Sequence, residues 1–138
     1  MNHQNAKIGR DYEDHVALYL MARGYELIDR NVRHESGAEL DLHMRHKTTG
    51  QEIGVECKAS RQDCNGPPGM QRSDNVWKVL GYTHALAMWS EDTGRRIDYV
   101  VVTSHVPLAG TKWDDLLQRA RLRKQLDLLL VPWPADVD

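Results

Sequence analysis

The sequence has 138 residues, of which 41% are hydrophobic and 28% are charged, and its formal net charge is −2. This composition excludes a disordered chain, which needs few apolar residues and a high net charge. No apolar run reaches the roughly 18 residues of a membrane span, so we expect no membrane contact. The polar N-terminus predicts no signal peptide, and two cysteines give no disulfide framework, so a cytoplasmic protein is expected.

Hydrophobic periodicity predicts the elements of the first half of the chain. Apolar residues recur at helical spacing from Lys7 to Arg23, and Gly24 supplies a helix stop. A strand should follow over residues 25–32. Alternating side chains then predict two strands over 38–46 and 52–60, joined as a hairpin by a turn.

The second half begins with a loop that contains the sequence NGPPG. A helix should run over residues 73–90, and we expect its apolar side to contain Val76, Trp77, Leu80, Ala87 and Met88. The continuous apolar run 97–104 is typical of a strand covered on both faces. Thr111 and Asp114 have the spacing of a helix cap, and a last strand lies in 125–133.

The predicted order is therefore helix, three strands, helix, strand, helix, strand. This order predicts an α/β fold in which a mixed central sheet is flanked by helices. The whole chain, 1–138, should form one domain, with a short tail from about residue 134.

The predicted hairpin contains candidate catalytic and metal-binding residues. Period-two alternation predicts Leu40, Leu42 and Met44 on one face of the first strand, and Glu39, Asp41, His43 and Arg45 on the other. On the second strand, Glu56 and Lys58 share a face and Cys57 points away. If Asp41 lies on the same side as Glu56 and Lys58, two carboxylates and one ammonium converge at the end of the hairpin.

Such a group suits phosphodiester hydrolysis. Mg²⁺ favours carboxylate oxygen and water as ligands, and usually takes one or two protein carboxylates. A metal bound in this way activates water and neutralises the charge that develops on the phosphate. A lysine beside it can orient the attacking water or stabilise the developing charge.

The sequence resembles the PD-(D/E)XK nuclease superfamily in four motif residues. Glu13 lies in GRDYE on the first helix, Asp41 in GAELDL, and Glu56 and Lys58 in VECK. Leu40 stands where the superfamily name has a proline. The pattern is most similar to small Holliday junction resolvases and YraN-like proteins, and the resemblance implies a restriction-endonuclease-like core.

The resemblance also implies roles for these residues. Asp41 and Glu56 would hold Mg²⁺, for which Mn²⁺ could substitute; Glu13 would contribute directly or through water; and Lys58 would assist the nucleophilic water. Gln71 and Glu39 are accessory candidates. The implied activity is DNA endonuclease, structure-specific in the manner of a Holliday junction resolvase, by a homodimer.

DNA contact requires positive charge near the site. We take Arg61 and Arg72, which flank the NGPPG loop, and Arg45 and Lys47 of the hairpin as candidates. Trp77 and Trp113 fit helix faces, and we expect them in the core rather than as base-stacking platforms. Two alternatives stay open: a restriction or phage-defence nuclease guided by a partner, and a catalytically silent nucleic-acid-binding or assembly module.

Overall fold

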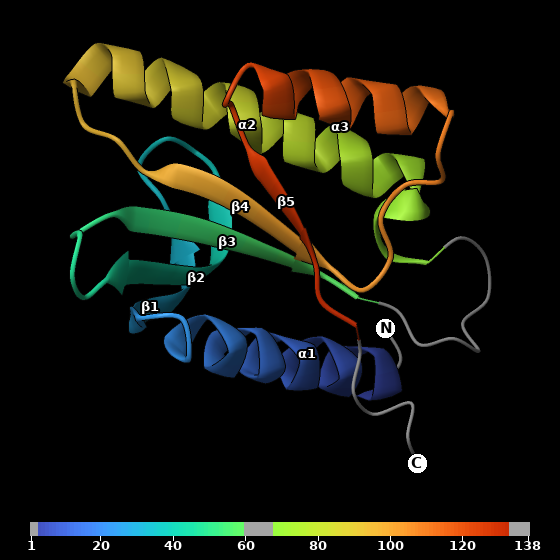
Figure 1. Cartoon of the computed structure of the whole chain (residues 1–138), viewed down its shortest axis with the longest axis horizontal. Helices are drawn as coiled ribbons and strands as arrows, with labels where there is room; N and C mark the ends of the chain where they lie inside the picture. The colour runs from blue at the N-terminus through green and yellow to red at the C-terminus, as the bar shows by residue number, and fades with distance from the viewer. Residues whose placement is uncertain (1–2, 60–67, 133–138) are drawn as a thin grey trace.

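The computed structural model describes residues 3–59 and 68–132, which form a five-stranded mixed sheet between helices (Figure 1). The strands lie in chain order, with β1 to β3 antiparallel and β3 to β5 parallel. Their bounds are β1 Tyr25–Arg33, β2 Glu39–His46, β3 Glu52–Lys58, β4 Asp98–Thr103 and β5 Asp127–Leu130. The helices are α1 His3–Met21, α2 Ser73–Thr93 and α3 Lys112–Leu122, with a short 3₁₀ helix, η1 Gly69–Gln71. The predicted element order and the α/β class are confirmed.

The sheet has a hydrophobic core on each face. α1 covers one face, where Tyr12 and Val16 pack with apolar residues of β2 to β4. α2 and α3 cover the other face, where Val76 and Leu117 lie in the second cluster. Strand β4 contributes alternate residues to both clusters, which confirms the predicted two-sided burial of this run: Val100, Val102, Tyr99 and Val101.

One side chain of β2 does not follow the predicted alternation. Leu42 and Met44 lie in the core on the α1 side, as a regular strand requires, but Leu40 lies in the core on the α2 side. The expectation that all three share a face is therefore wrong at Leu40. The pairing of β2 with β3 extends only as far as Leu42 opposite Val55, whereas Leu40 is still paired with Val32 of β1, so this end of β2 leaves β3 while it keeps β1 as a partner.

The buried face of α2 also differs from the prediction. The buried residues are Val76, Val79, Thr83, Leu86 and Trp89, which follow helical spacing. Trp77 is 57% exposed, Met88 is 48% exposed and Ala87 is exposed too, so the prediction that they form the buried side of the helix is wrong. The helix is rotated so that the stripe through Val79 and Thr83, rather than the one through Trp77, meets the sheet. Trp113 of α3 is half-buried and packs against the α2-side core, as predicted.

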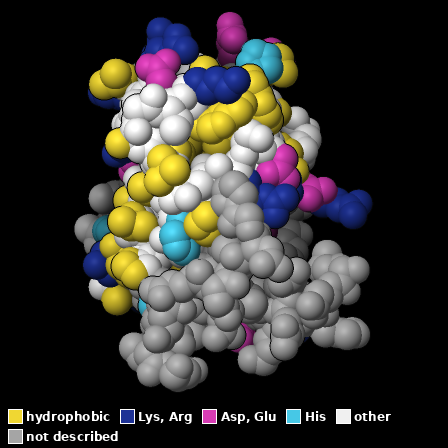
Figure 2. Space-filling view, turned by 90° about the vertical axis from the view of Figure 1, so that its right-hand side faces the viewer, with side chains coloured by type: hydrophobic (Ala, Val, Ile, Leu, Met, Phe, Trp, Pro, Cys, Tyr) yellow, Lys and Arg dark blue, Asp and Glu magenta, His cyan; other side chains and the backbone are white. Residues whose placement is uncertain are grey.

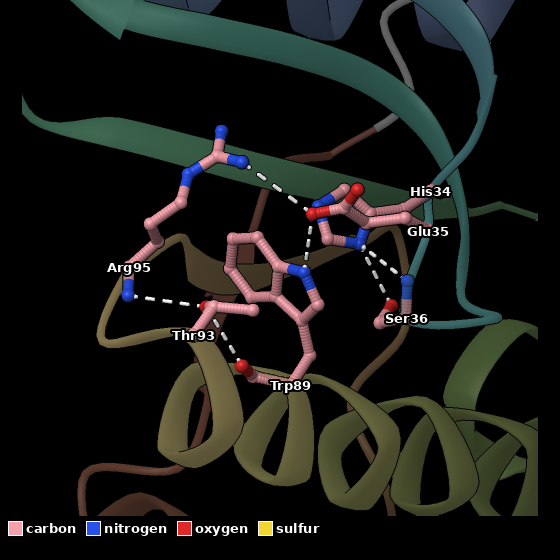
Figure 3. Close-up of polar contacts among 6 residues, drawn as sticks. All are labelled: His34, Glu35, Ser36, Trp89, Thr93 and Arg95. Carbon is pink, nitrogen blue, oxygen red and sulfur yellow. Dashed lines mark hydrogen bonds and ion pairs between the residues drawn. The ribbon is translucent and has the colours of Figure 1, made fainter.

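Polar contacts fasten the far end of α2 to the turn between β1 and β2 (Figure 3). The Trp89 indole N–H donates a hydrogen bond to Glu35 Oε1 at 2.6 Å, and Arg95 lies 3.4 Å from the same oxygen. The His34 ring meets Trp89 edge-on, with centroids 4.5 Å apart. This end of α2 lies opposite the end at which β3 terminates (Figure 1).

The last two elements are close to prediction. Thr111 caps α3, because its side-chain oxygen accepts a hydrogen bond from the Asp114 backbone N–H at 3.2 Å. Strand β5 is shorter than the predicted run and forms an edge of the sheet, where Leu130 is 55% exposed. The predicted tail from about 134 lies outside the described residues. No helix in the described ranges is long and apolar enough to cross a membrane.

Candidate active site

The open end of the β2–β3 hairpin brings the two motif strands together. Beyond Leu42 the backbone ladder between these strands ends, and the Asp41 side chain takes its place. Asp41 Oδ2 accepts a hydrogen bond from the Cys57 backbone N–H at 2.7 Å. The aspartate therefore lies directly against the Glu-Cys-Lys segment of β3, as the sequence predicts.

Glu56 is the most deeply buried acidic side chain of this site. It is 2% exposed, and its Oε1 lies 3.3 Å from Lys58 Nζ. That contact places Glu56 and Lys58 on one face of β3, while Cys57 packs against the α1-side core. Burial, followed by the negative charge of Asp41, raises the pKa of Glu56 from 4.5 to about 7.

Asp41 and Glu13 complete the acidic group. Burial is the main cause that raises the pKa of Asp41 above its usual value, opposed by the hydrogen bond from the Cys57 backbone. Glu13 reaches the site from α1 and is half-buried. Burial, and then the charge of Asp41, raises the pKa of Glu13 to about 7, so these two carboxylates lie within electrostatic range of each other.

Space for this arrangement depends on Gly54. A Cβ at this position would lie only 2.8 Å from Leu40 Cδ1. The missing side chain thus lets Leu40 cross the face of β3, immediately before Asp41. The glycine and the altered course of β2 together fix where the aspartate enters the site.

Three further residues contribute to the site that the sequence did not indicate. The charge of Lys78, on α2, lowers the pKa of both Asp41 and Glu56. The hydroxyl of Tyr99 is buried without a hydrogen-bond partner in the described structure, and burial, followed by the charges of Glu56 and Asp41, raises the pKa of Tyr99. Burial, followed by the charges of Glu39 and Glu56, raises the pKa of Tyr82. None belongs to a motif: the docking of α2 on the sheet brings Lys78 and Tyr82 near the site, and the pairing of β4 with β3 brings Tyr99 there.

The predicted accessory residues take different positions. Glu39 is exposed, and its charge raises the pKa of Asp41, which places it near the site. Gln71 lies in η1, next to Met70, whose backbone N–H donates to His105 O at 2.9 Å. Among the described contacts, the Gln71 amide makes no hydrogen bond with a carboxylate of the site.

The predicted DNA-binding cations are separated by the fold. Arg72 stands at the start of α2, half-exposed and paired with Asp74 at 3.2 Å. Arg45 pairs with Glu26 at the other end of β2, and Lys47 follows in the hairpin turn. The structure does not bring these last two to the carboxylates, because β2 runs away from Asp41 toward the turn. Arg61 lies outside the described residues.

The donor set fits a hard divalent cation. No group of three or more His, Cys, Asp or Glu side chains that could hold a metal ion occurs among residues 3–59 and 68–132. Mg²⁺ does not require one, because it usually keeps several waters and takes one or two carboxylates. Asp41 and Glu56 supply two, and a cation held by them would offset the negative charge of Asp41, which, after burial, raises the pKa of Glu56.

Comparison with known proteins agrees with this architecture. A repair endonuclease from Pyrococcus abyssi has a crystal structure similar to this fold, with a TM-score of 0.56 and 17% identity over 90% of this chain and 47% of that chain. At that identity the likeness concerns the fold alone, and it confirms the restriction-endonuclease-like core.

Two curated relatives are both described as UPF0102 protein. The one from Syntrophotalea carbinolica is 41% identical over 68 residues, 49% of this chain and 53% of the relative. The one from Aquifex aeolicus is 40% identical over 52 residues, 38% of this chain and 48% of the relative. The chain thus spans about half the length of the curated relatives it matches. The protein-family model described as "Uncharacterised protein family UPF0102" matches residues 12–102 of this chain, which include Glu13, Asp41, Glu56 and Lys58. The chain therefore belongs to the UPF0102 family.

Proposed function

We propose that this protein is a divalent-metal-dependent endonuclease that hydrolyses phosphodiester bonds in DNA. The observation that carries the proposal is Glu56, 2% exposed, with Lys58 Nζ at 3.3 Å and Asp41 beside it. The endonuclease-like fold supports the same reaction class.

The energetics of the site favour a functional reading of these charges. A buried carboxylate is costly unless it is paired and hydrogen-bonded. Here the charge of Asp41 adds to the cost of ionised Glu56, and the ammonium groups of Lys58 and Lys78 offset part of that cost. With Glu13 as a third carboxylate, the acidic groups of the site outnumber these two ammonium groups. A fold that keeps such a group is less stable than one with apolar side chains in its place. Binding of a cation and a phosphate would explain why the protein retains these buried charged side chains.

Each side chain then has a role. Asp41 and Glu56 would hold the cation, which when bound supplies charge neutralisation and a more acidic water. Lys58 donates hydrogen bonds from a position beside Glu56 and can hold the attacking water or a phosphate oxygen. Glu13, with a pKa of about 7, can accept or return a proton near neutral pH.

The substrate we propose is branched or distorted DNA. With a net charge of −2, the chain cannot hold long duplex by bulk charge, since non-specific affinity scales with the phosphates neutralised. Lys78, which acts on the carboxylates, and Arg72, at the start of α2, give a short basic footprint. A short footprint gains most from DNA that bends or branches. Cleavage of two strands further requires two copies, because each chain has one such site.

The test is cleavage of linear, nicked, flapped and four-way-junction DNAs in Mg²⁺ or Mn²⁺. Wild type should cut, EDTA should stop the reaction, and Asp41→Asn and Glu56→Gln should be inactive. Glu52→Gln is the matched control, since it removes a charge from the same strand where Glu52 contacts His43 instead of the site. A folded protein that cuts no substrate would favour the silent binding module. Cutting that depends on base sequence would favour the restriction-like alternative.

A further inference from the structure

An aromatic pair with one exposed ring stands at the same end of the molecule as the acidic site, and its other ring, Trp113, is half-buried against the α2-side core. Trp77 of α2 and Trp113 of α3 meet edge to face, with ring centroids 5.6 Å apart and planes at 81°. Trp77 is nevertheless 57% exposed. A large aromatic ring fixed by a neighbour and still open to solvent is not explained by the core of the domain.

A cavity lies beside this pair. It has a volume of about 340 Å³, within the range of small-molecule sites, and its lining is mostly apolar. Trp113, Leu108 and Pro107 form its apolar walls, and Gln71 contributes an amide that has no hydrogen-bond partner in the described structure. The Trp113 ring and the Gln71 amide together suit a planar aromatic group, such as a nucleobase, that has hydrogen-bonding atoms on its edge.

Both cations and carboxylates surround the pair: Lys112 and Asp114 flank Trp113, and Asp74, which pairs with Arg72, lies one helical turn before Trp77. The Lys112 ammonium lies 4.8 Å from the centroid of the Trp113 ring. Lys78 follows Trp77 in α2, and neither lysine has a carboxylate within salt-bridge distance in the described residues. In Figure 2, which faces this end, hydrophobic side chains are visible with both Lys or Arg and Asp or Glu side chains among them. This pattern of aromatic rings and unpaired ammonium groups favours a polyanion with π faces over an apolar protein partner.

The pair is also connected to the acidic site. The Ser104 backbone N–H donates to Lys58 O at 3.2 Å, so the segment that leads to Leu108 begins against the catalytic strand. Lys78 acts electrostatically on Asp41 and Glu56. Figure 1 shows the end of β3 and the starts of α2 and α3 at one end of the molecule.

We propose that Trp77 and Trp113 form a stacking platform for an unpaired nucleobase of the DNA substrate. The inference rests on the proposed nuclease function and names its substrate class: DNA with a single-stranded segment next to the cleaved phosphate. Base stacking on an aromatic side chain needs no base pairing and tolerates any base, so the platform selects single strands, flaps and branch points over closed duplex.

The experiment measures binding of a labelled oligothymidylate of roughly ten nucleotides, within the span of known single-strand sites, and of a blunt duplex of equal charge. Both are measured by fluorescence anisotropy in EDTA. Trp77→Ala should weaken single-strand binding roughly 5- to 150-fold, the range of one stacked base, and leave duplex binding within about twofold. Trp77→Phe should restore most of the affinity. Met88→Ala, which removes another exposed apolar side chain of α2, is the control and should change neither.

Three outcomes would overturn the platform. They are no measurable single-strand binding by wild type, equal loss of single-strand and duplex affinity, and an unchanged single-strand affinity in Trp77→Ala. In the last case, light scattering that shows a dimer in wild type and a monomer in the variant would assign the face to self-association. Because binding is read without metal, the two proposals fail separately. Trp77-dependent binding without cleavage refutes the nuclease, and cleavage with Trp77-independent binding refutes the platform.

Discussion

Replacing Glu56 by glutamine should make the metal-free protein more stable at alkaline pH. The pKa of Glu56 rises from 4.5 to about 7 on folding. Because the folded state has the higher pKa, the carboxyl contributes its full stability below about pH 4.5, and this contribution is lost as the pH rises through about 7. Each pKa unit corresponds to about 1.4 kcal/mol, so the ionised group costs the folded state about 3 kcal/mol above pH 7.

Glutamine has nearly the shape of the protonated side chain and cannot ionise. In EDTA, the free energy of unfolding of Glu56→Gln minus that of wild type should therefore increase by about 2–3 kcal/mol from pH 5 to pH 8. For a chain of this size the change corresponds to roughly 10 °C in Tm. Urea unfolding at several pH values, followed by circular dichroism, measures it.

An exposed glutamate supplies the control for this measurement. Glu91 lies exposed near the end of α2, and Glu91→Gln, which removes a carboxylate from the surface instead of the site, is the matched variant. The reasoning would be refuted if the free energy of unfolding of Glu56→Gln minus that of wild type were independent of pH, or decreased toward pH 8. Added Mg²⁺ should raise the Tm of wild type at pH 8 and leave that of Glu56→Gln unchanged, because binding to the folded state alone stabilises it.

Three other predictions concern single residues around the site. Glu13→Gln should slow cleavage less than Asp41→Asn does and remove an ionisation near pH 7 from the rate profile; an unaltered profile contradicts the role of Glu13. Gly54→Ala should reduce the free energy of unfolding by about 1–3 kcal/mol through overpacking against Leu40, which an unshifted urea midpoint would disprove. Arg72→Glu should weaken binding to all DNAs alike and reduce the salt dependence of binding, whereas a loss confined to one base sequence would mark Arg72 as a base reader.

The elements and the acidic core of the site follow from local sequence patterns. Alternation places Glu56 and Lys58 on one face of β3 with Cys57 away from them, and the structure has this arrangement. Such patterns work because successive side chains of a regular strand point to opposite faces of the sheet. Helix boundaries are less well determined: α1 spans His3–Met21 where the sequence predicts Lys7 to Arg23.

The errors arise where tertiary contacts override the local period. Leu40 changes sides because the ladder ends at Leu42 and Gly54 leaves room for it. Trp77 is exposed because the docking of α2 on the sheet, and not its composition, selects the buried stripe. Both depend on residues distant in sequence, which no pattern within one element contains.

The hairpin pattern alone could have shown that two of the predicted DNA-binding cations lie far from the site. Asp41 is near the start of β2, so Arg45 and Lys47 must lie toward the opposite end of an antiparallel hairpin. Lys78, in contrast, is brought to the carboxylates only by the packing of α2. Proximity in sequence to a motif is therefore a poor guide to which cations share its site.

The most direct test of the central claim is the cleavage rate of Glu56→Gln beside wild type in Mg²⁺ at pH 8, on the DNA that wild type cuts best. The account predicts a variant that is folded, at least as stable as wild type without metal, and at least about 100-fold slower. A folded Glu56→Gln that cuts within tenfold of the wild-type rate would contradict the claim that this buried carboxylate is retained for catalysis.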